Sequence, residues 1–103
     1  MVTILIRRCV RRDKEKEFIE GYKSQSPTEA PGFISERLTK VRDSNVLPEP
    51  MRSFKVASEN CVTYINIARW ESMESFIAHF NPKNTHEPEV ETEDRVRVVL
   101  DEI

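Results

Sequence analysis

The stretch from Tyr64 to Phe80, "YINIARWESMESFIAHF", holds the polar side chains best placed for chemistry. Asn66 and Trp70 lie four residues apart in its first half, which has the pattern of a strand, so both point to one face of a sheet. His79 lies near the end of the second half, which has the pattern of a helix. A buried Asn amide can donate a hydrogen bond to a developing oxyanion, and an indole can provide an apolar wall and an N–H donor. These three residues are therefore the candidate catalytic residues.

Each candidate also has a structural explanation. A Trp at a strand-to-helix corner packs in the core of a small domain, and a His beside an apolar helix stripe can be half-exposed without acting as a base. Asn66 interrupts an apolar strand, and an unpaired buried amide costs about 1 to 3 kcal/mol. We therefore expect a backbone group, a water molecule or a ligand to satisfy its hydrogen bonds.

Length and composition narrow the class of protein. A chain of 103 residues, 38% hydrophobic and 33% charged with a net charge of −2, is expected to form one domain over residues 1–103. The chain has no excess of basic residues, which argues against a nucleic-acid-binding protein. It also has no apolar run close to the roughly 20 residues that a transmembrane helix needs. The short apolar N-terminal stretch precedes its charges, the reverse of a secretory signal, so a cytoplasmic location is expected. Cys9 and Cys61 form no CxxC pair and no zinc spacing, so we expect inert free thiols and no metal site.

Hydrophobic periodicity predicts four strands and two helices. The strands are expected at residues 2–10, 33–41, 61–70 and 95–103, and the helices at 13–25 and 72–80, with Asp13 and Ser72 as N-caps. Between the second and third strands, residues 43–60 contain Pro48 and Pro50 and are expected to be irregular. A connection of this length is either functional or a surface insertion, and both alternatives stay open.

The order β-α-β-β-α-β with right-handed crossovers predicts a ferredoxin-like α+β fold, a four-stranded antiparallel sheet with both helices on one face. We expect strands 2–10 and 61–70 to lie side by side in the centre and to run parallel. Cys9 and Cys61 would then lie at opposite ends of the sheet, roughly 20 Å apart or more, too far for a disulfide. The uncovered face carries apolar residues from several strands, so we expect a homodimer joined through the sheets.

Two segments carry a family resemblance that covers nearly the whole chain. "PGFISERL" before and along the second strand, and "RWESMESFIAHF" at the strand-to-helix corner, resemble the antibiotic biosynthesis monooxygenase domain family of dimeric α/β barrel proteins. The resemblance implies oxidation of an aromatic polyketide or quinol by O2 without metal or flavin, so no cofactor is expected and the partner is a small aromatic molecule. Asn66 and Trp70 match an Asn–Trp pair of the polyketide oxidisers. Those enzymes use a Tyr where this chain has Phe76, which cannot donate a hydrogen bond, and Tyr22 or Tyr64 could substitute for it.

Other members of that family degrade haem with an Asn, a Trp and a His, and here Arg7, His79 and His86 fall at or near those positions. Arg7 and Arg69 either bind an anionic substrate or pair with Glu36 or with an acid across the dimer. The resemblance thus implies a pocket between sheet and helices. Its expected lining is Trp70, Asn66, Tyr22, Phe76 and His79, with Tyr64 and Arg7 as further substrate-binding candidates. The alternative is a non-catalytic homodimer that binds a small hydrophobic ligand.

Overall fold

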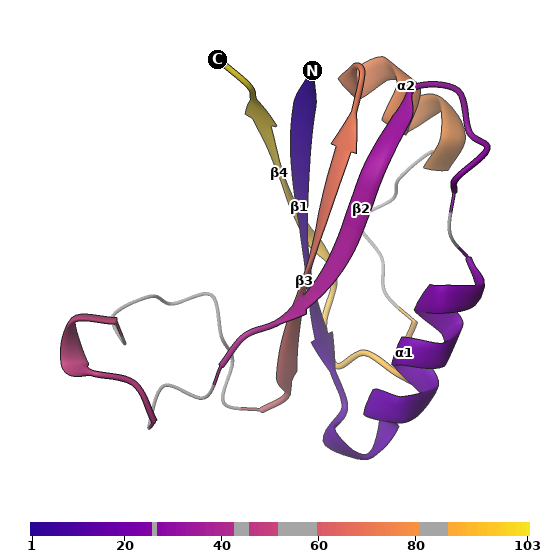
Figure 1. Ribbon diagram of the computed structural model, residues 1–103. Helices are drawn as coiled ribbons and strands as arrows, with labels where there is room; N and C mark the ends of the chain where they lie inside the picture. The colour runs from indigo at the N-terminus through magenta and orange to yellow at the C-terminus, as the bar shows by residue number, and fades with distance from the viewer. Residues whose placement is uncertain (26, 43–45, 52–59, 81–86) are drawn as a thin grey trace.

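The computed structural model describes residues 1–25, 27–42, 46–51, 60–80 and 87–103. Figure 1 shows a single sheet with two helices on one side of it and both termini at one end of the sheet. The elements in chain order are β1 (Val2–Val10), α1 (Glu15–Ser24), β2 (Phe33–Lys40), β3 (Val62–Trp70), α2 (Met73–Phe80) and β4 (Val96–Asp101). The predicted strands and helices are therefore confirmed, with boundaries that differ by one or two residues.

The four strands form one antiparallel sheet in the order β2-β3-β1-β4. The predicted ferredoxin-like α+β fold is confirmed, with β1 and β3 in the centre. The expectation that β1 and β3 run parallel is wrong, because Val2 pairs with Trp70 and Val10 with Val62. The reason is that β3 reverses direction after β2 and inserts between β2 and β1, so it runs against both neighbours.

The antiparallel pairing also corrects the expected position of the cysteines. Cys9 lies opposite Thr63, two residues from Cys61, so both thiols are at the same end of the sheet rather than at opposite ends. Both are buried and free. Burial, followed by hydrogen bonds with Cys61 and Glu93, raises the pKa of the Cys9 thiol, which is consistent with an unreactive Cys9.

The two helices begin differently. Ser72 is the N-cap of α2 as predicted, because its Oγ accepts a hydrogen bond from the Ser75 backbone N–H at 3.1 Å. The prediction that Asp13 caps α1 is wrong. Asp13 lies inside a short 3-10 helix, Arg12–Lys14, and Lys14 precedes α1 without a side-chain cap.

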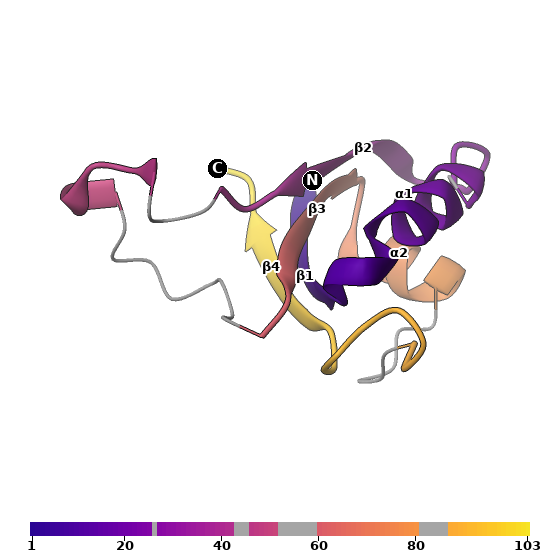
Figure 2. The same ribbon diagram turned by 90° about the horizontal axis from the view of Figure 1, so that it is seen from below.

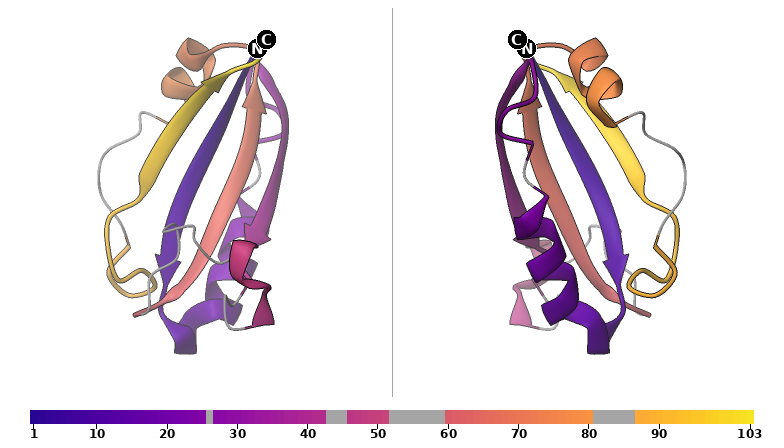
Figure 3. Two further views of the ribbon diagram at one scale, coloured as in Figure 1. Left: turned by 90° about the vertical axis from the view of Figure 1, so that its left-hand side faces the viewer. Right: turned by 90° about the vertical axis from the view of Figure 1, so that its right-hand side faces the viewer.

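Two apolar clusters lie between the helices and the sheet. The first contains Trp70 and Phe76 with Val2, Ile4 and Ala68, and the second contains Val10, Phe18 and Tyr64. α1 thus packs near one end of the sheet and α2 near the other, as Figure 3 shows. This separation leaves room between the helices above the middle of the sheet.

Neither α1 nor α2 covers the opposite face of the sheet (Figure 2). We call it the open sheet face. Its residues come from all four strands, because Leu5 pairs across with Ile67 and Val98, and Ile67 with Arg37. On β4 the side chains of Val96, Val98 and Leu100 are 46%, 47% and 44% exposed.

The predicted irregular connection, residues 43–60, lies mostly outside the described residues. Its described part includes a short 3-10 helix, Glu49–Met51, on the side of the sheet away from α1 and α2 (Figure 2). His86 also lies outside the described residues. Among the helices of the described ranges, none is long and apolar enough to cross a membrane.

Candidate functional site

A pocket of about 570 Å³ lies between the helices and the middle of the sheet. Its volume falls within the range of roughly 300 to 1,000 Å³ that is typical of small-molecule sites. Aromatic and aliphatic side chains form much of its wall, namely Ile6, Phe18, Phe76, Phe80 and Val90. The sequence-predicted residues Tyr22, Asn66 and Phe76 all line it.

A chain of three polar side chains crosses the pocket. The Tyr22 hydroxyl on α1 donates to Asn66 Oδ1 on β3 at 2.8 Å, and Asn66 Nδ2 donates to Glu36 Oε2 on β2 at 3.3 Å. All three residues line the pocket. Asn66 is buried, and these two partners satisfy the amide that interrupts the apolar strand.

Tyr22 keeps its proton over the physiological pH range. Burial first, and then the adjacent Glu36 carboxylate, raise the pKa of Tyr22 to about 12. Because the hydroxyl donates to Oδ1, the amide is held with its Nδ2 directed toward Glu36. Tyr22 therefore positions Asn66 as a hydrogen-bond donor.

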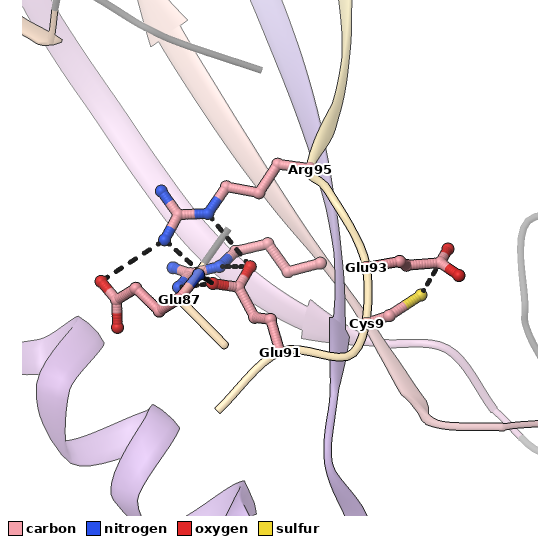
Figure 4. Close-up of polar contacts among 6 residues, drawn as sticks. Cys9, Glu87, Glu91, Glu93 and Arg95 are labelled. Carbon is pink, nitrogen blue, oxygen red and sulfur yellow. Dashed lines mark hydrogen bonds and ion pairs between the residues drawn. The ribbon is translucent and has the colours of Figure 1, made fainter. Parts of the chain in front are cut away.

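Three arginines line another part of the pocket, namely Arg8 on β1, Arg95 just before β4 and Arg97 on β4. Arg8 donates from Nε and Nη2 to Glu91 at 2.9 and 3.1 Å, and Arg95 donates from the same two atoms at 3.0 Å each. The Arg8 guanidinium also lies 4.5 Å from the centre of the Phe18 ring. Figure 4 shows Glu91 beside Arg95, with Glu87 nearby and the Cys9–Glu93 contact apart from them.

Glu91 is fully buried and ionised. Burial by itself opposes ionisation, but hydrogen bonds from Arg95, Arg8 and the Glu87 backbone outweigh it and lower the pKa of Glu91 to about 2. The pKa of Arg97 is lowered by burial and by the positive charges of Arg95 and Arg8. All three arginines line the pocket.

The structure places four of the sequence-predicted site residues away from the pocket lining. Trp70 is fully buried within the first apolar cluster, and its ring packs edge-on against Phe33 and Phe76. Its indole N–H has no acceptor among the described residues. His79 is exposed on α2, with its ring 5.9 Å from that of Trp70.

The other two residues away from the pocket lining are Tyr64 and Arg7. Tyr64 donates to Glu15 Oε1 at 2.6 Å and packs on Phe18, so it ties α1 to the sheet. Arg7 points to the open sheet face and pairs with Glu93 at 3.0 Å. Arg7 thus pairs with an acid of the same chain, Glu93, and not with Glu36, the partner named from the sequence.

The sequence analysis missed Arg8, Arg95 and Arg97, and it treated Glu36 only as an ion-pair partner. The alternation of side chains along a strand could have indicated Arg8. Arg8 is an even number of residues away from the buried Val2 and Ile4, so it points to the same face of the sheet. That signal is weak here because Leu5 makes β1 apolar on both faces. Arg95 and Glu91 lie in a polar segment whose composition gives no sign of burial.

No family model and no curated protein matches the sequence. The solved structures that share the fold include the following three. The haem degrader MhuD from Mycobacterium tuberculosis, solved with two haems in its active site, has a TM-score of 0.64 and 15% identity, covering 100% of this chain and 96% of that one. A protein from Bacillus cereus assigned as an antibiotic biosynthesis monooxygenase has a TM-score of 0.59 and 12% identity over 98% and 90% of the chains. SnoaB, a cofactor-independent oxygenase from Streptomyces nogalater, has a TM-score of 0.54 and 20% identity over 99% and 92%.

The chain has the fold of these monooxygenase-like proteins. The resemblance predicted from "PGFISERL" and "RWESMESFIAHF" is thus confirmed in the fold. At identities of 12 to 20%, the comparison does not transfer a substrate or a reaction.

The described residues do not fit haem well. Iron in haem proteins is commonly held by His, Cys, Met or Tyr. Of these types, the described pocket lining contributes Tyr22 alone, and its hydroxyl keeps its proton and donates to Asn66. His79, which stands where the haem-degrading members have a Trp, is not among the lining residues, and His86, near the position of their His, lies outside the described residues. We therefore derive no chemical step through haem.

Proposed function

We propose that this chain is a cofactor-independent oxygenase that binds a flat, acidic aromatic molecule or quinol and oxidises it with O2. The observation that carries this proposal is the Tyr22–Asn66–Glu36 chain inside a pocket with aromatic walls. It combines a carboxylate that can accept a proton with an amide donor held in one orientation. An oxygenase that uses the substrate's own electrons needs these two functions in a site that excludes water.

In this mechanism Glu36 accepts the acidic proton of the bound substrate. Asn66 has two amide N–H donors, one of which reaches Glu36, and the second stabilises the enolate or phenolate oxygen. The electron-rich anion then reacts with O2. One oxygen atom enters the substrate and the other leaves as water with two substrate hydrogens, so no external reductant is needed.

Replacing Asn66 with Ala tests this assignment. We expect oxygen consumption with hydroquinones or anthrones to fall by roughly 10²- to 10³-fold, the usual effect of losing one oxyanion donor. The measurement is oxygen uptake in chelator-treated buffer, with the rate of spontaneous oxidation subtracted.

The matched control is Asn60→Ala, which removes an exposed amide just before the same strand and should leave the rate unchanged. Thermal unfolding of both variants checks that each is folded. A folded wild-type protein that binds these compounds without oxidising them would reject the oxygenase. It would support the alternative, a non-catalytic protein that binds a small hydrophobic ligand.

We also propose that two copies of the chain pair through the open sheet face. The support is the row of exposed side chains on β4, Val96, Val98 and Leu100, beside the partly buried Leu5 and Ile67 of the central strands. An apolar face of this kind is normally covered in solution. The location in the cell remains the prediction made from the sequence.

Two neighbouring valines on β4 test the dimer. Val98 is 47% exposed on the open sheet face, and Val99 is 43% exposed on the helix side. We expect Val98→Glu to convert a dimer to a monomer, because it places a charge in the interface, and Val99→Glu to leave the dimer intact. Light scattering after size exclusion measures both, and a monomeric wild type would contradict the proposal.

A further inference from the structure

The two glycines of the chain lie in very different surroundings. Gly32, in the turn before β2, has a φ of +85°, and a Cβ atom built on it would lie 2.5 Å from Ser75 Oγ. Both the backbone and the packing therefore require glycine there. Gly21 lies inside α1, and among the described residues no atom lies within 4 Å of the position that its Cβ would take. The fold thus gives no reason for glycine at position 21.

A glycine inside a helix destabilises it, because glycine loses more conformational freedom on folding than alanine does. Gly21 does not end the helix either, since α1 continues to Ser24. Its carbonyl oxygen accepts a hydrogen bond from Ser24 Oγ at 2.9 Å, so this backbone acceptor already has a partner within α1. The missing side chain therefore needs an explanation outside the helix.

Gly21 lies in the wall that α1 gives to the pocket. This wall is formed by Glu17, Phe18, Gly21, Tyr22 and Gln25, the last of which is the C-cap of the helix. Their spacing places all five on one side of α1. Gly21 is one turn from Glu17 and one turn from Gln25, so its missing side chain leaves a gap within the wall, which we call the helix notch. Because no described atom fills the position of a Cβ at residue 21, the helix notch is open to the pocket.

The helix notch is next to the polar chain on which the proposed reaction depends. Tyr22 follows Gly21 directly, and its hydroxyl donates to Asn66 Oδ1 at 2.8 Å. On the other side Phe18 is buried, with its ring 4.9 Å from that of Tyr64, so this part of the wall is fixed by the core. A ligand whose reacting atoms lie at Asn66 therefore has the helix notch beside it.

We propose that Gly21 is a specificity-determining residue, whose missing side chain admits ligands too large for a pocket with a side chain at that position. The part of the ligand in the helix notch would contact helix backbone whose carbonyl is already hydrogen-bonded, so an apolar part suits it. This inference rests on the proposed function for the class of ligand. Its two tests measure stability and binding, not the reaction.

The Gly21→Ala variant tests, without any ligand, whether the fold needs this glycine. We expect the midpoint of thermal unfolding to rise by about 4 °C, because alanine favours the helix and its Cβ meets no described atom. Gly32→Ala is the matched control and should lower the midpoint, because its Cβ would collide with Ser75. Circular dichroism measures both. An unchanged or lower midpoint for Gly21→Ala would overturn the proposal.

The Gly21→Leu variant tests the helix notch with two probes of different size. Hydroquinone has one ring and anthrone has three, and both are titrated under nitrogen so that neither is oxidised. Quenching of the fluorescence of Trp70, the one tryptophan of the chain, reports binding. We expect Gly21→Leu to weaken anthrone binding about tenfold or more, because the added side chain overfills the pocket, and to weaken hydroquinone binding much less.

Glu20→Leu is the matched control for binding. Glu20 precedes Gly21 on α1, is exposed and does not line the pocket, so this variant should keep both affinities. Anthrone binding that Gly21→Leu leaves unchanged, equal losses for the two probes, or a wild-type protein that binds neither probe would each overturn the proposal.

Oxygen uptake separates this inference from the proposed function. Size selection that depends on residue 21, without oxygen uptake from any hydroquinone or anthrone, would leave the helix notch standing and reject the oxygenase. Uptake that depends on Asn66, in a protein whose anthrone binding is unchanged by Gly21→Leu, would do the reverse.

Discussion

The Glu91→Gln variant is expected to lose about 3 to 5 kcal/mol of its free energy of unfolding at pH 7, the usual cost of breaking a buried ion pair. Glu91 is fully buried, and its two oxygens accept hydrogen bonds from Arg8, Arg95 and the Glu87 backbone. The amide keeps the shape but not the charge, so two partly buried guanidinium groups lose their counter-ion. Urea denaturation followed by circular dichroism measures the difference.

The same residue predicts how stability depends on pH. The pKa of Glu91 is about 2 in the folded protein, below its ordinary value of 4.5. A lowered folded-state pKa means that the stabilisation is complete above pH 4.5 and is lost as the pH falls toward 2. We expect Glu91→Gln to remove this component, so that the stability difference between wild type and variant narrows in that pH window.

Glu102→Gln is the matched control. Glu102 accepts two hydrogen bonds from Arg69, at 2.9 and 3.2 Å, but this pair is exposed. Exposed ion pairs contribute little, so this variant should be close to the wild type. Equal effects of the two substitutions would show that burial of Glu91 is not what makes its ion pairs matter.

The fold was largely predictable from the sequence, because periodic apolar residues mark each strand and helix. The wrong prediction that β1 and β3 run parallel has a single cause. Adjacency of β1 and β3 follows from two crossovers, whereas their relative direction depends on the reversal between β2 and β3. That error alone misplaced Cys9 and Cys61. The prediction that Asp13 is the N-cap was wrong because a 3-10 turn precedes α1, and sequence patterns locate helix starts poorly.

The candidate site was less predictable, because the sequence does not show to which face of the sheet each side chain points. Arg7 and Arg8 are adjacent, and only one of them can point to the helices. Because β1 is apolar on both faces, its sequence does not indicate which one does. Asn66 and Trp70 were correctly placed on one face, but α1 and α2 bury the two ends of that face and leave Asn66 beside the pocket.

Replacing Glu36 with Gln should have the largest effect on catalysis if the proposed function is correct. We expect kcat/KM for oxygen-dependent oxidation to fall by roughly 10²- to 10⁴-fold, the range for loss of a general base. Gln keeps the length of the side chain and can still accept the Asn66 Nδ2–H bond, which spans 3.3 Å here. A loss would therefore reflect proton transfer rather than a displaced Asn66. Glu29→Gln, an exposed change in the loop before β2, is the control for a general effect of charge.

Tyr22→Phe then separates positioning from proton transfer. Its hydroxyl keeps its proton, with a pKa of about 12, and donates to Asn66 Oδ1 at 2.8 Å. Removing it leaves Glu36 as a base but lets the amide rotate. We expect kcat/KM to fall less than in Glu36→Gln, and a substrate ionised before it binds should rescue Glu36→Gln but not Tyr22→Phe. If pre-ionised substrate did not rescue Glu36→Gln, Glu36 would not be the base. If it rescued Tyr22→Phe as well, Tyr22 would act in proton removal and not only in positioning Asn66.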